Sequence, residues 1–308
     1  MLSFTVRRLL MAIPTLFILV TLSFFMMQSA PGSPFTGDFN LPPEVLANIE
    51  AKYHLDKPMW QQYLYYLGDL MQGDLGPSFK YRDYSVNELV AASFPVSITL
   101  GCVAFVFTVI FGTALGTVAA LKQNTWIDYT VMSLAMVGVV LPSFVLAPVL
   151  VLIFAVGLQW LPAGGWNDGH WMNLVLPVSA MAILYMASIS RIMRGSMIEV
   201  LNAPYIRTAH AKGLPMKHII FKHALRPAML PVVSYLGPAF VGIITGSVVI
   251  ETVFGIPGIG QYFVNGALNR DYSLVLGLTI LVGALTIFFT AIVDIVYGMI
   301  DPRIRVES

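Results

Sequence analysis

The histidines are the residues of this chain best suited to hold a metal ion or to transfer a proton. Five are present, at His54, His170, His210, His218 and His223. None of them belongs to an HExxH pattern, and the GxSxG pattern of a serine nucleophile is also absent. Their spacing does not define one common site. The sequence therefore predicts no catalytic residue, no metal site and no enzymatic activity.

A phosphate-binding loop is a second chemical device for which the sequence can be searched. Such a loop ends in Gly-Lys followed by Ser or Thr, because its backbone amides and its lysine surround the phosphates. The chain contains no Gly-Lys pair. If the protein depends on ATP, another subunit must bind and hydrolyse it.

Ionisable residues in the middle of apolar segments would indicate coupling to an ion or proton gradient. The candidates here are Glu251 and Asp294, and each lies near the end of an apolar segment. We expect each of them to anchor a helix end rather than to relay protons. This favours a transport machine powered by a partner, with a secondary transporter or a channel as the weaker alternative.

Small polar residues could line a pathway that offers a solute no fixed charge. Thr245, Ser247 and Asn265 are the candidates for this role. The same side chains could equally form hydrogen bonds between neighbouring helices, and both interpretations stay open. A pathway for a metal ion would instead need a cluster of His, Cys or carboxylate groups to bind the ion.

The elements that hold these residues follow from an unusual composition. Hydrophobic residues make up 57% of the 308 residues and charged residues only 11%, against about 25% charged in an ordinary soluble domain. Six strongly apolar stretches contain no charged residue: 9–37, 89–121, 129–167, 169–190, 227–250 and 272–293. Each exceeds the roughly 20 residues that cross a bilayer as a helix. The sequence therefore predicts an all-α polytopic membrane protein with six transmembrane helices.

Some features of these stretches predict irregular or tightly packed helices. The third stretch, from about Asp128 to Val156, contains Pro142 and Pro148, which predict a kink. The additional charge-free run 252–269 is rich in Gly, Pro and Asn, which predicts a loop or re-entrant turn. Two glycine pairs permit close helix approach: Gly112 with Gly116, and Gly242 with Gly246.

The basic residues predict the orientation of the chain in the membrane. With the N-terminus inside, the short outer loops hold only Arg270, whereas twelve Lys and Arg residues fall in the inner segments. Both termini are therefore predicted to be cytoplasmic. The first apolar stretch is interpreted as an uncleaved anchor, because its apolar run is longer than that of a secretory signal and Pro31 follows the only plausible cleavage residue, Ala30.

Three parts follow from this topology. Residues 1–30 form an N-terminal tail and the first transmembrane helix, residues 31–94 an extracytoplasmic helical insert, and residues 95–308 a five-helix core. In the insert, Pro43 and Pro58 open two predicted short helices. The second is rich in Trp and Tyr, which suit either the headgroup level of the membrane or a small aromatic core; both alternatives stay open.

The core contains a predicted cytoplasmic loop, 195–228. We expect two short helices here, the first ending near Lys212, with Gly213 as a left-handed cap and Pro215 beginning the second. Basic residues of the second helix stand among apolar ones. Such a helix could bind anionic lipid headgroups, or it could dock in a groove on a cytoplasmic partner.

The segment RTAHAKG, at 207–213, resembles the cytoplasmic loop of binding-protein-dependent ABC importer permeases. In the family's general pattern Glu-Ala-Ala is followed after three residues by Gly. Here the triplet is Arg-Thr-Ala and the glutamate is absent, so no role of that glutamate can be moved onto Arg207. This variant looks like the peptide and nickel branch. The resemblance implies an ATPase-coupling loop made by Arg207, Thr208, Ala209, Ala211, Lys212, Gly213, Leu214 and Pro215.

Three other segments resemble the same branch: 55–79 in the insert, 251–272 before the last stretch, and 294–305 near the C-terminus. Their fit is best to oligopeptide importers, with dipeptide and nickel importers as alternatives. The resemblance implies a type I ABC importer permease in the bacterial inner membrane, without a cofactor of its own. The implied partners are a second homologous permease subunit, two cytoplasmic ATPase subunits that bind ATP and Mg, a periplasmic substrate-binding protein, the peptide substrate and membrane lipid, but no nucleic acid.

Overall fold

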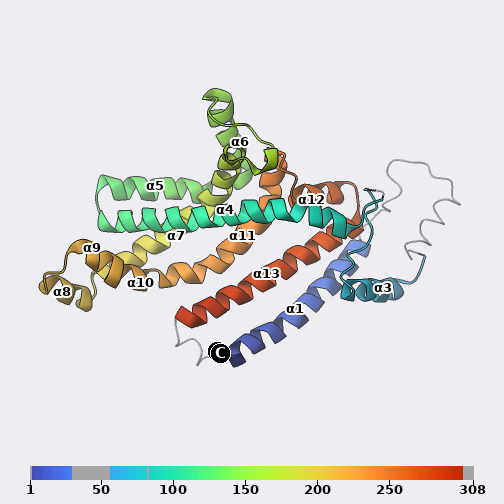
Figure 1. The fold of residues 1–308 in the computed structure, drawn as a ribbon, viewed down its shortest axis with the longest axis horizontal. Coiled ribbons are helices and arrows are strands. Elements are labelled where there is room, and N and C mark those ends of the chain that lie inside the picture. The colour runs from blue at the N-terminus through green and yellow to red at the C-terminus, as the bar shows by residue number, and fades with distance from the viewer. Residues whose placement is uncertain (1, 30–55, 82, 301–308) are drawn as a thin grey trace. The chain divides into compact units, whose positions relative to one another are not determined.

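The computed structural model describes residues 2–29, 56–81 and 83–300, and regular structure in these ranges is helical apart from one isolated bridge (Figure 1). In chain order the helices are α1 (Leu2–Gln28), α3 (Met59–Met71), α4 (Val86–Leu121), α5 (Trp126–Val140), α6 (Ser143–Leu150), the π-helix η1 (Val151–Gly157), the 3₁₀-helix η2 (Asn167–Gly169), α7 (Trp171–Leu201), α8 (Pro204–Ala211), α9 (Met216–His218), the π-helix η3 (Ile219–Ala224), α10 (Leu225–Ala228), α11 (Leu230–Phe254), α12 (Ile259–Leu268) and α13 (Tyr272–Ile300). The helix predicted after Pro43 lies outside the described residues.

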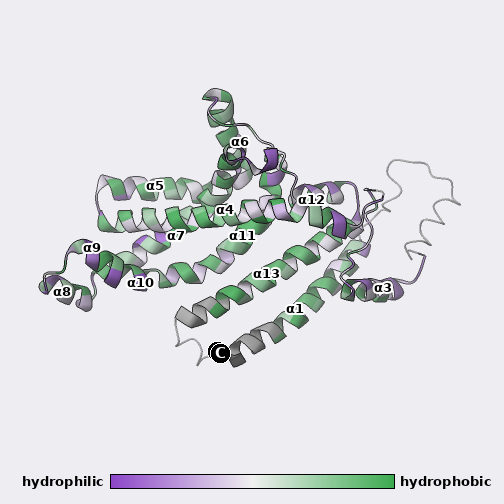
Figure 2. Ribbon diagram, viewed as in Figure 1, coloured by the Kyte–Doolittle hydropathy of each residue, from purple (hydrophilic) through white to green (hydrophobic). Residues whose placement is uncertain are grey.

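The described residues contain five single helices that are long and apolar enough to cross a membrane, in α1, α4, α7, α11 and α13. A sixth span results if the bent pair of α5 and α6–η1 counts as one. Hydrophobic residues cover these helices along most of their length (Figure 2). The predicted all-α polytopic architecture is therefore confirmed.

The third predicted span is broken more sharply than a simple kink. Its two halves, Trp126–Val140 and Ser143–Gly157, meet at 113°, and α6 turns away from α5 at this point (Figure 1). Leu141 is extended at φ −79° and ψ 120°, as expected for a residue before proline. Pro142 then occupies the cap position of α6, where its missing N–H leaves no helical bond unmade.

The run 252–269 contains a helix that is too short to be a span. α11 continues to Phe254 and ends at Gly255, whose φ of +63° is in the left-handed region. The ten-residue helix α12 follows at Ile259–Leu268, whereas a transmembrane helix needs roughly 20 residues.

The described helices belong to two compact units. The first comprises Met1–Val6, Ser97–Ile256 and Phe289–Ser308, and the second comprises Arg7–Val96 and Pro257–Phe288. In the first unit α7 packs against α5, α6 and α11. It also contacts α4, because a Cβ at Gly112 would lie 2.9 Å from Cγ2 of Ile189. Close approach at the predicted glycine pattern of α4 is thus observed.

The second unit brings the insert onto the first transmembrane helix. Val20 and Phe24 of α1 share a buried cluster with Leu276 of α13. On α3, the hydroxyl of Tyr63 lies 2.6 Å from that of Thr21, and its ring centroid lies 5.3 Å from that of Phe24. This face of α3 is therefore an aromatic core.

Other aromatic residues of α3 are more exposed. The side chains of Trp60 and Tyr65 are 59% and 49% exposed. Tyr66 joins the aromatic core, with its ring centroid 5.7 Å from that of Phe24, and burial raises the pKa of its phenol. The aromatic-core alternative is thus observed for Tyr63 and Tyr66, whereas placement at the headgroup level stays a prediction.

α4 begins inside the predicted insert, at Val86, nine residues before the boundary at 95. Its start is fixed by a reciprocal pair of bonds, in which the amide of Glu88 donates to Ser85 Oγ at 3.2 Å and the amide of Ser85 donates to Glu88 Oε2 at 2.8 Å. This capping box satisfies two of the amides that a helix start leaves unbonded. It fixes the direction in which the chain enters the second span.

Candidate functional site

The loop 195–228 has the predicted arrangement of helix, glycine turn and helix. α7 extends into it as far as Leu201, and α8 follows at Pro204–Ala211. Lys212 caps α8, and Pro215 is the cap residue of α9. The second helix does not end within the loop, because α9, η3 and α10 lead into α11 with a break only at Met229.

Gly213 closes α8 through a Schellman motif. Its amide donates to the carbonyl of His210 at 2.9 Å, and the amide of Leu214 donates to the carbonyl of Ala209 at 3.3 Å. This pair of bonds requires a left-handed residue, and the φ of Gly213 is +73°. A Cβ at Gly213 would meet nothing within 4 Å. The glycine is therefore needed for its backbone conformation and not for space.

One face of the loop packs into the first unit. Ile206 and Ala209 of α8 and Ile219 of η3 are buried in one cluster with Met193 and Met197 of α7. Ala209, a predicted coupling residue, is thus a packing residue. This cluster joins α8 to the end of α7.

The other face of the loop is exposed to solvent or to a partner. Of the predicted coupling residues, Leu214 is half-buried and the exposed ones are Arg207, Thr208, Ala211, Lys212, Gly213 and Pro215. The Thr208 hydroxyl donates to the carbonyl of Pro204 at 3.1 Å, so it is bonded within its own helix. Apolar residues add to this surface, with Phe221 72% exposed and Tyr205 47% exposed.

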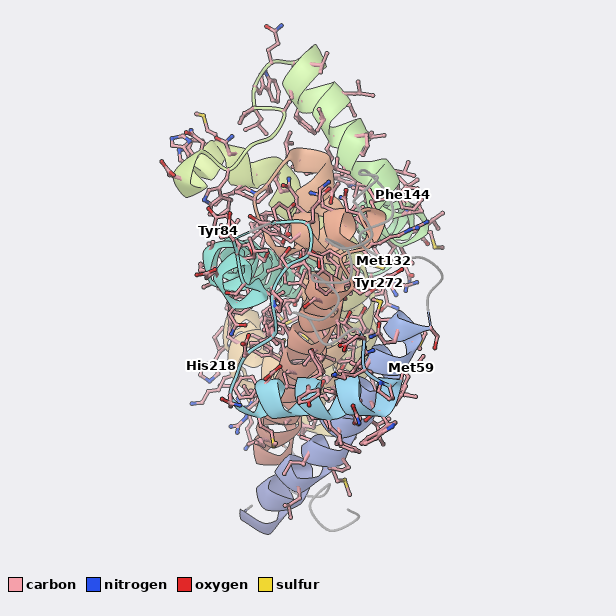
Figure 3. All side chains as sticks on the ribbon, turned by 90° about the vertical axis from the view of Figure 1, so that its right-hand side faces the viewer. Met59, Tyr84, Met132, Phe144, His218 and Tyr272 are labelled. Carbon is pink, nitrogen blue, oxygen red and sulfur yellow. The ribbon has the colours of Figure 1, made fainter. Side chains whose placement is uncertain are left out.

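An open groove lies beside this surface. Its volume is about 290 Å³, and it is lined by Phe221, Leu225, Arg226, Met229, Leu230 and Val233. The two nearby histidines, His218 and His223, have ring centroids 5.6 Å apart, and His218 projects from the surface (Figure 3). No group of three His, Cys, Asp or Glu side chains within the described ranges could hold a metal ion.

The three candidate pathway residues lie in different surroundings. Thr245 is exposed on α11, whereas Ser247 is fully buried and donates to the carbonyl of Ile244 at 2.7 Å. Asn265 belongs to the second unit, where it is exposed on α12 near Tyr81. Burial and the neighbouring Tyr262 raise the pKa of Tyr81, and the polar side chain of Asn265 opposes this shift.

An ion pair that the sequence did not predict joins α5 to α7. Arg194 donates from Nε to Oδ1 of Asp128 at 2.6 Å and from its terminal nitrogen to Oδ2 at 2.7 Å. The amide of Asn124 donates to the same carboxylate at 2.9 Å. Asp128 lies just before the charge-free run 129–167, and Arg194 lies shortly after the charge-free run 169–190. The predicted topology puts both residues at the same side of the membrane, and this shared side is the signal in the sequence that could have suggested the ion pair.

Models of one protein family match nearly the whole chain. A model described as a binding-protein-dependent transport system inner membrane component matches residues 112–306. A model of the N-terminal part of such a membrane component matches residues 1–101. The first match includes α8 and Gly213, and the second includes α1 and α3.

Characterised relatives span the full length of the chain. The oligopeptide transport system permease protein OppB of Salmonella typhimurium is 69% identical over 305 residues, covering 99% of this chain and 100% of the relative. OppB of Haemophilus influenzae is 67% identical with the same coverage. The dipeptide transport system permease protein DppB of Bacillus subtilis is 44% identical over 308 residues, covering 100% of this chain and 99% of the relative.

Solved structures support the fold. The MetNI methionine ABC transporter in an inward-facing conformation contains a chain that matches with a TM-score of 0.55 at 17% identity, over 69% of this chain and 96% of that one. An amino acid ABC transporter matches with a TM-score of 0.52 at 16% identity, over 69% and 94%. These likenesses show the fold alone. The apolar helices and the family matches over both halves of the sequence describe a multi-pass inner-membrane protein, and the chain belongs to the inner-membrane components of binding-protein-dependent transport systems.

Proposed function

We propose that this chain is a pathway-forming subunit of an ATP-driven oligopeptide importer. The observation that carries the proposal is the 69% identity, over the full length of both chains, to an oligopeptide transport system permease protein. The lower identity of 44% to a dipeptide permease protein makes dipeptide import the second candidate. The subunit itself is non-catalytic, because it lacks a Gly-Lys phosphate-binding loop.

The partners follow from the kind of machine. A second homologous permease subunit completes the pathway, two cytoplasmic ATPase subunits bind ATP and Mg, and a periplasmic binding protein delivers the peptide. The distribution of basic residues supports a cytoplasmic side for both termini and for the 195–228 loop. On that side, the exposed face of α8 and the turn at Gly213 dock on an ATPase subunit. When the two ATPase subunits close on each other, they bias the membrane helices toward one conformational state.

Two of the three candidate pathway residues are exposed. Thr245 is exposed on α11 and Asn265 on α12, so both can face a passing solute. Ser247 is buried and bonded to its own helix, which favours a packing role. A pathway without fixed charge suits peptides whose side chains differ in sign and size, and it leaves selectivity to the binding protein.

Deletion of the gene for this chain tests the substrate. The deletion strain should lose uptake of labelled tri- and tetrapeptides and resist toxic peptide analogues, and a plasmid copy should restore both. Nickel accumulation should not change. Parental rates of tri- and tetrapeptide uptake, in a strain without a second peptide system, would refute the oligopeptide assignment. Selective loss of dipeptide uptake would favour the second candidate.

A further inference from the structure

The Asp128–Arg194 ion pair is built more firmly than a surface contact. It is bidentate, with both bonds between 2.6 and 2.7 Å, and Asp128 is only 1% exposed. The amide of Asn124 holds the same carboxylate from its own chain segment. A planar guanidinium that meets both carboxylate oxygens fixes orientation as well as distance. The start of α5 is therefore fixed to one turn of α7.

That turn of α7 is also fixed to α4. A Cβ at Gly116 would overlap the carbonyl of Ser190 and would lie 3.1 Å from the amide nitrogen of Arg194. Since the atoms it would meet are mostly backbone, the two helices touch here without intervening side chains. α4 and α5 thus both contact α7 within residues 190–194.

The same stretch of α7 carries the 195–228 loop. Met193 and Met197, on either side of Arg194 in sequence, belong to the buried cluster that contains Ile206 and Ile219 of the loop. A packed core transmits displacement because its side chains interdigitate without voids. The loop, the end of α7 and the start of α5 are therefore in continuous contact within one compact unit.

α5 leads into the bent segment of the membrane part. It meets α6 at 113°, and η1 continues from α6. Near its other end α5 touches α7 again at Gly138, where a Cβ would lie 2.8 Å from Cγ2 of Ile183. At the end nearest the loop, the ion pair adds a polar connection to the packing of α5 against α7. Without it, the start of α5 would follow α7 less closely.

We infer that Asp128 and Arg194 are positioning residues for transport, whose ion pair makes α5 and its bent continuation follow the 195–228 loop. The inference rests on the proposed function, since it assumes that the loop receives a displacement from ATPase subunits. It assigns the pair no contact with the peptide. Loss of the pair should therefore leave ATP hydrolysis in place and reduce the transport that each ATP supports.

The test uses the complete complex in proteoliposomes, with peptide uptake and ATP hydrolysis measured on the same vesicles. Arg194→Gln should lower peptide transported per ATP by roughly 2- to 30-fold, the range that follows from typical changes in coupling energy. Arg191→Gln is the matched control, because Arg191 is exposed on the same helix three residues earlier. Arg194→Lys keeps the charge without the bidentate geometry and should give a smaller loss in the same direction.

The reversed pair, Asp128→Arg with Arg194→Asp, should restore much of the ratio lost in Arg194→Gln. An unchanged ratio in both Arg194→Gln and Arg194→Lys would overturn the inference. So would a fall in uptake and hydrolysis in equal proportion, since this would indicate a loss of assembled complex only. No uptake by the parental complex would instead remove the proposed function, and the inference with it.

Discussion

The carboxylate of Asp271 accepts a hydrogen bond of 2.5 Å from the hydroxyl of Ser78, which lies 193 residues earlier in the chain. The same carboxylate accepts hydrogen bonds from the backbone amide of Lys80 at 3.0 Å and from that of Leu274 at 3.1 Å. Asp271 thereby caps α13 and holds the insert with one side chain that is completely buried.

Asp271→Ala should loosen the insert and destabilise the start of α13. The variant loses the helix cap and leaves buried hydrogen-bond donors without an acceptor, which lowers the free energy of unfolding by roughly 1–3 kcal/mol. Hydrogen exchange should accelerate in residues 75–85, as measured by mass spectrometry of the purified protein. Asp69→Ala removes an exposed carboxylate from α3 and is the control. Equal exchange in both variants would show that Asp271 does not hold the insert.

Gly213→Val should disturb the turn after α8. A β-branched residue at a φ of +73° costs about 1–2 kcal/mol, and there is no steric conflict to add to it. We expect normal membrane insertion, weaker recovery of ATPase subunits on affinity purification, and lost uptake. Gly213→Asn should keep part of the activity, because asparagine tolerates the left-handed region better.

Gly195→Ala is the matched control for that series. Gly195 also has open space around its Cβ position, but it lies within α7 and has no positive φ. Alanine is favoured over glycine inside a helix, so recovery of the complex should not fall. Normal uptake by Gly213→Val at normal abundance would show that this turn does not couple the subunits.

Gly116→Ala should weaken the contact of α4 with α7. The new methyl group would meet the carbonyl of Ser190 and would lie 2.7 Å from Cβ of Met193, neither of which can rotate away. Overpacking of this kind costs roughly 1–3 kcal/mol. Thermal unfolding in detergent should shift to lower temperature. Gly68→Ala in α3, where the added Cβ meets nothing within 4 Å, should shift it slightly upward instead.

The orientation can be tested with two single-cysteine variants. The native Cys102 is the only cysteine and is first replaced by serine. Asp69→Cys should then react with an impermeant maleimide added to intact cells, and Lys217→Cys should react only after the membrane is opened. Both positions are exposed, so access to the reagent depends on the membrane side. The reverse pattern would contradict the orientation and place the 195–228 loop outside.

Local features of the fold could be predicted from the sequence. Gly213 between Lys212 and Leu214-Pro215 encodes a helix end within a few residues, because the bonds of a Schellman motif join close neighbours. Pro142 marked the break in the third span for the same reason. The bend angle of 113° could not be predicted, since it depends on which helices pack against each half.

Contacts between distant residues were the part that the sequence did not reveal. Asp128 and Arg194 are 66 positions apart, and their pairing depends on the packing of α5 against α7. The role of small polar residues is equally hidden. Thr245 and Ser247 stand two positions apart on α11, so they point to different sides of the helix, and one is exposed while the other is buried.

The neutrality of the Asp128–Arg194 pair has an electrical consequence. Moving one elementary charge through the membrane potential takes about 2.3 kcal/mol per 100 mV. A bonded pair of opposite charges that moves together takes almost none. The remaining membrane-spanning parts of α4, α5 and α7, at 89–121, 129–140 and 171–190, carry no charged residue. These stretches therefore contribute no gating charge of their own to uptake.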